Sequence, residues 1–134
     1  MVTDVVLNKI QIIERCIKRI NEEYEGNKDN LKNFTKQDSI ILNIQRACES
    51  SIDLAMHLVS EKKLGIPQSS REVFDILSEH KLIDEALAEK LKAMVGFRNI
   101  AVHDYQQINL NIVENIIKNN LQELKYFSEQ ILKI

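Results

Sequence analysis

The sequence contains very few residues that interrupt a helix, and this shortage constrains its fold more than any other feature. Only three of the 134 residues are glycine and one is proline. An all-β fold needs many tight turns, and turns depend on these residues. Leu, Ile, Glu, Lys and Ala are abundant instead, and they are compatible with long helices. The sequence therefore predicts an all-α protein.

Two helices are expected in the first half of the chain. The first should be capped at Thr3 or Asp4 and stopped at Gly26, since apolar residues in between recur at steps of three and four. The second should begin at the capping box of residues 35–38 and run to about Lys62. The apolar face of the first helix comprises Val6, Ile10, Ile13, Ile17, Ile20 and Tyr24.

Three further helices are expected in the second half. A capping box at residues 69–72 opens a short helix, Asp84 caps a long helix that passes through Arg98, and Asn109 caps the last helix. The expected inward positions of the long helix are Leu87, Leu91, Met94, Val95 and Val102. Four long helices and one short helix, with short connections, predict an antiparallel bundle, and we expect residues 1–134 to form a single domain.

The composition limits the classes of function. A formal net charge of −2 differs from the basic excess of a general nucleic-acid binder, so any RNA site should be local. Cys16 and Cys48 lack the close spacing of a metal or redox motif and are expected to be reduced and buried. The sequence has neither a signal-peptide pattern nor a membrane-spanning apolar run, so we expect a cytoplasmic protein.

Residues 96–105 bring an arginine, a histidine and a tyrosine close together. Arg98 supplies a permanent cation, His103 can exchange protons near neutral pH, and Tyr105 supplies a phenol. Residues five apart in a helix project about 140° from each other, so Arg98 and His103 should diverge. Either the helix unwinds near His103, or two subunits enclose a shared cleft across a two-fold axis, and we favour the dimer.

This stretch resembles the HEPN-domain ribonucleases, which carry an arginine, four to six residues and a histidine. It is most similar to the HepT-type toxins, whose motif Arg-x4-His-x-Tyr is matched by Arg98, His103 and Tyr105. Segments 45–57, 65–70 and 94–105 also look like that family, so the resemblance covers nearly the whole chain.

The resemblance implies a homodimeric, metal-independent endoribonuclease toxin of a type VII toxin–antitoxin pair, with no cofactor. Its site would lie in a cleft between protomers and contain Arg98 and His103 from each. Its partner would be a minimal nucleotidyltransferase antitoxin, which neutralises the toxin by transferring AMP to Tyr105.

The residues themselves fit this chemistry. RNA can be cleaved by attack of the ribose 2′-hydroxyl on the adjacent phosphorus, for which His103 can exchange protons while Arg98 binds phosphoryl oxygens. Asn99 can orient His103 or donate to the phosphate. Asp53 is a second supporting candidate, a carboxylate that can orient a basic group or form an ordinary ion pair.

Three other interpretations remain. Arg98 and His103 can be structural, with Arg98 bridging to Asp104 or to a carboxylate of the second helix. The protein can be a non-catalytic dimeric module that binds a nucleotidyltransferase or a nucleotide. A metal enzyme using the three histidines has little support, because no close pair of ligands is present and we expect no metal site.

Overall fold

The helices of the computed structural model, which describes residues 3–134, follow one another with short connections. A 3₁₀ turn, Lys28–Lys32, joins the first two helices, and a second, Tyr105–Gln107, follows the fourth. No strand is present in residues 3–134, which confirms the all-α prediction. The helices are α1 (Asp4–Tyr24), α2 (Phe34–Glu61), α3 (Ser70–Glu79), α4 (Glu85–His103), α5 (Leu110–Asn115) and α6 (Leu121–Leu132).

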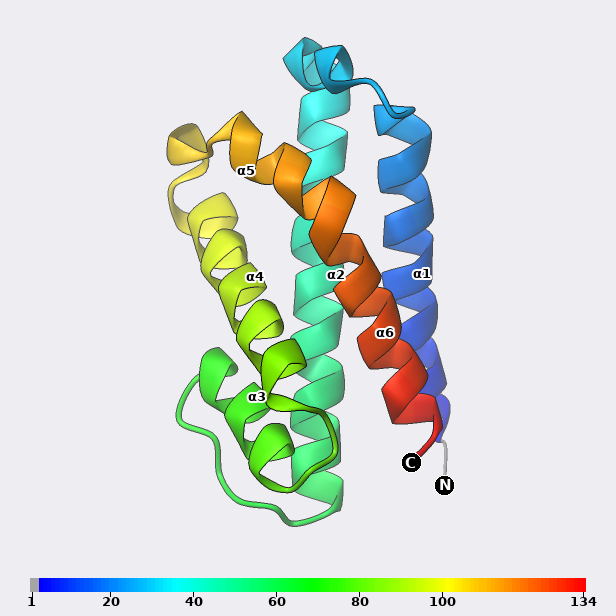
Figure 1. Ribbon diagram of the computed structural model, residues 1–134, viewed down its shortest axis with the longest axis vertical. Coiled ribbons are helices and arrows are strands. Elements are labelled where there is room, and N and C mark those ends of the chain that lie inside the picture. Colours follow the sequence, from blue (N-terminus) through cyan, green and yellow to red (C-terminus); the bar gives the residue numbers. More distant parts are fainter. Residues whose placement is uncertain (1–2) are drawn as a thin grey trace.

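The long helices form a bundle around α2 (Figure 1). Helix α1 runs antiparallel to α2 on one side, and α4 lies on the other side with the short α3 beside it. Helices α5 and α6 are joined by a single π-helical turn, Ile116–Asn120, and together form the fourth long segment, which crosses α2 diagonally. The predicted arrangement of four long helices and one short helix is therefore confirmed.

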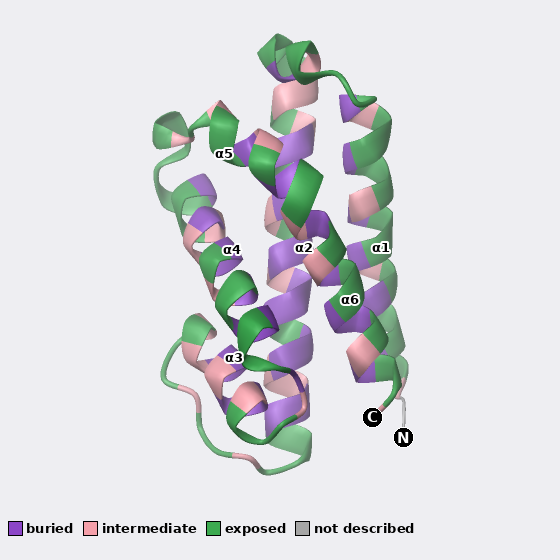
Figure 2. Cartoon of the chain, in the orientation of Figure 1, coloured by how far each residue is buried: buried purple, intermediate pink, exposed green. Residues whose placement is uncertain are grey.

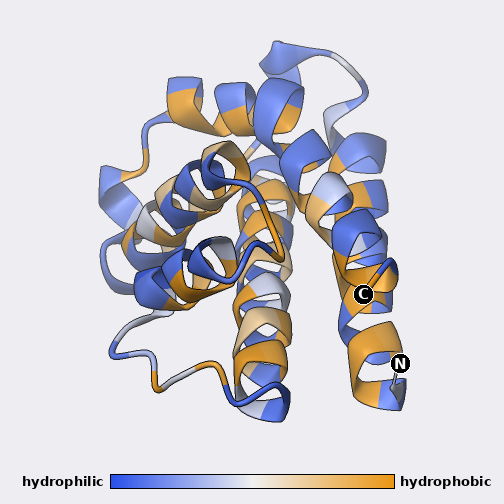
Figure 3. Cartoon of the chain, turned by 60° about the horizontal axis from the view of Figure 1, so that its bottom comes forward, coloured by the Kyte–Doolittle hydropathy of each residue, from blue (hydrophilic) through white to orange (hydrophobic). Residues whose placement is uncertain are grey.

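The core lies between the inward faces of these helices (Figure 2). Apolar stripes run along the inner side of each helix, and charged residues occupy most of the outer side (Figure 3). Phe74 of α3 and Phe127 of α6 pack edge to face with ring centroids 5.8 Å apart. Fully buried side chains of this kind each contribute about 1.5–3 kcal/mol by leaving water, so the bundle is stabilised mainly by apolar burial.

The predicted helix caps are mostly confirmed. Thr3, Ser69, Asp84 and Asn109 each accept a hydrogen bond from a backbone N–H in the first turn of α1, α3, α4 and α5. Each such cap satisfies a donor that the helix itself leaves unpaired.

The predicted start of the second helix at a Thr35 capping box is wrong. Asn33 caps α2 instead, because its side chain accepts a hydrogen bond from the Lys36 N–H at 3.1 Å. Asparagine is as good an N-cap as threonine, and it stands directly after the preceding 3₁₀ turn, so the helix begins earlier at Phe34.

The expected inward position of Val102 is also wrong. Its side chain is 45% exposed, whereas the neighbouring Ala101 is buried. The inner face of α4 passes through Phe97 and Ala101, four residues apart, and Val102 is turned about 100° away from it. The outer side of α4 therefore carries exposed apolar residues at Ile100 and Val102.

Cys16 and Cys48 are free thiols in the core, as expected. Each helix within residues 3–134 is either too short or too polar to cross a lipid bilayer.

Candidate active site

Arg98 lies in the last third of α4, where its side chain is only 21% exposed. Its Nη2 donates a hydrogen bond to Ser70 Oγ at 3.2 Å, and its Nη1 lies 4.0 Å from Glu49 Oε2. Its Nε is buried and has no hydrogen-bond acceptor among the described residues. The guanidinium is thus held between α2, α3 and α4, and its terminal nitrogens carry more N–H groups than the contacts with Ser70 and Glu49 use.

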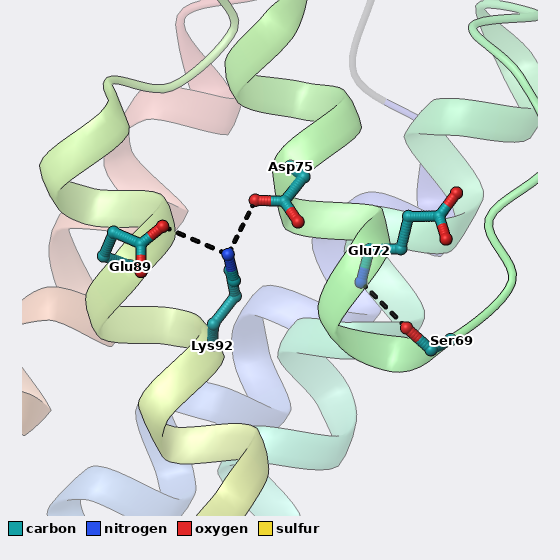
Figure 4. Close-up of polar contacts among 5 residues, drawn as sticks. All are labelled: Ser69, Glu72, Asp75, Glu89 and Lys92. Carbon is teal, nitrogen blue, oxygen red and sulfur yellow. Dashed lines mark hydrogen bonds and ion pairs between the residues drawn. The ribbon is translucent and has the colours of Figure 1, made fainter.

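The start of α3 places Ser70 beside Arg98, and Figure 4 shows the neighbouring contacts of Ser69 and Lys92. Ser69 caps α3 by accepting a hydrogen bond from the Glu72 N–H at 3.1 Å, which fixes the first turn. Lys92 of α4 then binds Asp75 of α3 at 2.9 Å and Glu89 at 3.1 Å, so the two helices are connected on the same side. Ser70, the first residue of α3, therefore stands where α3 meets α4.

His103 and Asn99 occupy the exposed end of α4. They stand one turn apart on nearly the same line of the helix, as expected for residues four apart. The Asp104 N–H donates to the Ile100 carbonyl at 2.8 Å, so α4 remains helical through His103. Of the two arrangements that the spacing left open, an unwound helix before His103 is therefore not observed.

A continuous helix separates Arg98 from His103. Their five-residue spacing turns the side chains about 140° apart around the axis of α4. Arg98 contacts Ser70 of α3 and Glu49 of α2, whereas His103 is exposed. Arg98 and His103 of a single chain are therefore not directed at the same phosphate. This geometry favours a site completed by a second copy of the chain.

Tyr105 lies in the 3₁₀ turn after α4 and is 41% exposed. The helix ends before it, so it does not line up with Arg98. Its hydroxyl donates a short hydrogen bond to Asp38 Oδ1 of α2. Partial burial, together with this hydrogen bond and the charge of Asp38, raises the pKa of Tyr105 to about 12, so the phenol is neutral at physiological pH.

Asp53 is not in contact with the other predicted residues. Its carboxylate accepts a hydrogen bond from Lys9 Nζ of α1 at 3.1 Å, on the outer surface between α1 and α2. Glu49, one turn earlier on α2, is the carboxylate that approaches Arg98. The ordinary ion-pairing interpretation of Asp53 matches this position.

No sequence pattern assigned a role in the site to Asp38, Ser70 or Arg71, which the fold brings to this region. A contact of Arg98 with a carboxylate of the second helix was left open, and Glu49 makes that contact. An added Cβ at Gly96 would lie 2.7 Å from Arg71 Nη2, so the Arg71 guanidinium rests against α4 at the one residue without a side chain. Ser70 and Arg71 directly follow the Ser69 cap, and this adjacency was the only available signal. Asp38 lies 67 residues from Tyr105, and no local pattern predicts their contact.

The Cys48 thiol lies near Arg98, but it is buried in the core. Burial raises the pKa of the Cys48 thiol to about 12, although the positive charge of Arg98 opposes this effect. The thiol therefore stays protonated and unreactive. Within residues 3–134, no group of three or more His, Cys, Asp or Glu side chains is arranged to hold a metal ion.

Comparison with known proteins places this site in context. The family model described as Ribonuclease HepT-like matches residues 13–131. The chain is 48% identical to the mRNA nuclease HepT of Shewanella oneidensis over 128 residues, covering 96% of each protein. It is 26% identical to the tRNA nuclease HepT of Aphanizomenon flos-aquae over 128 residues, covering 95% of this chain and 87% of that one.

Solved structures show the same fold. A tri-AMPylated Shewanella oneidensis HEPN toxin in complex with an MNT antitoxin has a TM-score of 0.94 and 48% identity, covering 99% of this chain and all of the other. A toxin–antitoxin crystal structure with AMP-PNP also has a TM-score of 0.94, with 47% identity over 98% of this chain and all of the other.

Proposed function

Because the chain belongs to the Ribonuclease HepT-like family, we propose that it is a metal-independent endoribonuclease toxin of a type VII toxin–antitoxin pair. Its 48% identity to an mRNA nuclease extends over 96% of both proteins, and we infer that residues 1–134 form a single HEPN-like domain. The observation that carries the proposal is the pairing of a partly buried Arg98, held by Ser70 and Glu49, with an exposed histidine at the end of the same helix.

Arg98 and His103 divide the reaction between charge and proton transfer. The ribose 2′-hydroxyl attacks the adjacent phosphorus, and the bond to the 5′-oxygen breaks. His103 accepts the proton of the 2′-hydroxyl, and its copy in the second subunit donates a proton to the leaving oxygen. The Arg98 guanidinium stabilises the charge that grows on the phosphoryl oxygens, so the residues supply both functions without a metal or other cofactor. Asn99 shares the exposed face with His103 and donates to the phosphate.

A homodimer brings these groups together. Ile100 and Val102 are exposed apolar residues on the outer side of α4, next to His103. Their burial against the same face of a second subunit would form an isologous interface and align two diverging Arg98–His103 pairs along one cleft. Asp53 forms an ion pair with Lys9 of α1, so we give it no direct role in this cleft.

Control of the toxin falls to a minimal nucleotidyltransferase antitoxin, as in the Shewanella complex. We assign Tyr105 as the acceptor of AMP, because its hydroxyl lies on an exposed turn directly after His103. The added phosphodiester places negative charge at the cleft and repels RNA phosphate. The pair acts in the cytoplasm, where its RNA substrate is found and where the free thiols Cys16 and Cys48 stay reduced.

Cleavage of RNA in EDTA tests this proposal. Purified wild type should cut RNA, and both His103→Ala and Arg98→Ala should lose about 10²–10⁴-fold in rate, the contribution of a general acid–base or oxyanion-stabilising group. Equal survival of the RNA with wild type and both variants would instead identify a non-catalytic dimeric module. Sedimentation at the assay concentration should give a dimer, and a monomer with full activity would refute the shared cleft.

A further inference from the structure

A carboxylate of α2 contacts the hydroxyl that the proposed function modifies. Asp38 lies one turn into α2, and its Oδ1 accepts the hydrogen bond from the Tyr105 hydroxyl. The two residues come from segments far apart in the chain and belong to different helical elements. The contact is thus produced by the tertiary fold, and it orients the phenol oxygen at the surface.

The Tyr105 side chain is partly exposed and borders an open cavity. Asp38 and Tyr105 are both exposed, and they line an open cavity of about 490 Å³ together with Phe34, Gln37, Ile41 and Ile108. The walls combine the aromatic ring of Phe34, which is 78% exposed, with apolar side chains from the turn after α4. A nucleotide held by a partner protein can therefore approach the phenol oxygen without any rearrangement of the core.

A neutral phenol needs a proton acceptor when it becomes a nucleophile. Because its pKa is raised to about 12, only a very small fraction of Tyr105 is ionised near pH 7. A carboxylate already hydrogen-bonded to the hydroxyl meets the geometric requirement for a general base, since no further movement is needed to transfer the proton.

We propose that Asp38 is the general base for AMP transfer to Tyr105, an inference that rests on the proposed function. The Tyr105 oxygen attacks the α-phosphorus of a nucleoside triphosphate while its proton passes to the Asp38 carboxylate. A bond forms between the phenol oxygen and the α-phosphorus, and the bond from that phosphorus to the β-phosphate oxygen breaks. Pyrophosphate leaves with the electron pair, and Asp38 later returns its proton to water. The toxin thus supplies part of the machinery for its own inactivation.

The same contact favours release of the modified side chain. Once the phenol oxygen is esterified it has no hydrogen left to donate, and the new phosphodiester carries a negative charge next to the Asp38 carboxylate. The loss of the hydrogen bond and the like charges both move modified Tyr105 away from α2.

The experiment compares Asp38→Asn, Asp38→Glu and Tyr105→Phe in the full chain. Each is mixed with the minimal nucleotidyltransferase antitoxin and ATP labelled at the α-phosphate, and the initial rate of label transfer is measured. Asp38→Asn should lower this rate by about 10–100-fold, Asp38→Glu should restore part of it, and Tyr105→Phe should take no label. Asp29→Asn is the matched control, because Asp29 is an exposed aspartate that pairs only with Lys32 at 3.7 Å.

Two further measurements separate the outcomes. RNA cleavage by unmodified Asp38→Asn should equal that of wild type, and its affinity for the antitoxin should be unchanged. Failure of wild type to take label at Tyr105 would overturn the proposed modification itself. Normal labelling of wild type and an equal rate for Asp38→Asn would overturn only the role of Asp38. A slower rate that is fully explained by weaker antitoxin binding would also overturn it, by making Asp38 a docking residue.

Discussion

Arg98 and Tyr105 are only seven residues apart in sequence, but their side chains differ in how far they are enclosed by the fold. Arg98 is enclosed by three helices, with Ser70 and Glu49 on either side of its guanidinium. Tyr105 stands on a short exposed turn, and its hydroxyl is held by the single contact with Asp38. In the function that we propose, the group that must meet a phosphate in one orientation is fixed in advance, whereas the group that another protein must modify is left accessible.

The largest expected effect comes from changing the enclosed group while keeping its charge. Arg98→Lys should lower the rate of RNA cleavage by about 100-fold, because a lysine ammonium lacks the planar fork that bonds two phosphoryl oxygens. Transfer of AMP to Tyr105 should continue at the wild-type rate. The two rates, measured side by side, test whether the regions are independent. A parallel fall in AMP transfer would show that they are one unit.

A smaller effect should follow from loosening the enclosure. Ser70→Ala removes the acceptor of the Arg98 hydrogen bond, and the rate of RNA cleavage should fall about 5–10-fold, the equivalent of one ordinary hydrogen bond of about 1 kcal/mol. The free energy of unfolding should change little.

The neighbouring serine supplies the control for that substitution. Ser69→Ala removes the cap of α3 and should lower the free energy of unfolding by about 1 kcal/mol, while the folded protein keeps its activity. Thermal unfolding of Ser69→Ala and Ser70→Ala measures their stability, and single-turnover cleavage of RNA measures their activity. Equal activities would show that Ser70 does not position Arg98.

The smallest effect concerns the exposed group and appears only at high pH. The folded-state pKa of Tyr105, about 12, lies above the ordinary value of 10, so the unfolded chain loses this proton first. The stabilisation is complete below about pH 10 and is lost as the pH rises from 10 to 12. The difference in phenolate absorbance between wild type and Tyr105→Phe should titrate near pH 12. In Asp38→Asn it should move part of the way toward 10, because partial burial remains. An ordinary titration near pH 10 in wild type would contradict the Asp38 contact.

Local signals predicted the helices well. Ser69, Asp84 and Asn109 cap the helices that they were expected to cap, because a cap depends on residues only three positions away. The predicted cap at Thr35 was wrong because Asn33, two residues earlier, caps α2 instead. The predicted inward position of Val102 was wrong because the sequence does not distinguish an apolar residue on a helix surface from one in the core. That distinction depends on which other elements pack against the residue.

The candidate site was predictable only in its own segment. Arg98, His103 and Tyr105 were identified from one motif, and their roles here stay proposals. Their neighbours come from α2 and α3, and sequence spacing contains no information about which turn of α2 faces Arg98. Asp53 was selected on α2, whereas the fold places Glu49, one turn earlier, next to Arg98, because the position of α4 along α2 is set by tertiary packing.

The π-helical turn at Ile116–Asn120 has a consequence for how this chain tolerates changes in length. A turn with i to i+5 hydrogen bonds accommodates one residue more than the α-helical turn it replaces. Val113 before it and Leu124 after it are both fully buried, so the surplus residue is absorbed without rotating either half of the segment out of the core. The loss of one residue between 116 and 120 would convert the turn to an ordinary α-helix, whereas the same deletion elsewhere in the last helix would turn half of its apolar face toward water. Relatives with a last helix one residue shorter should therefore have lost that residue here.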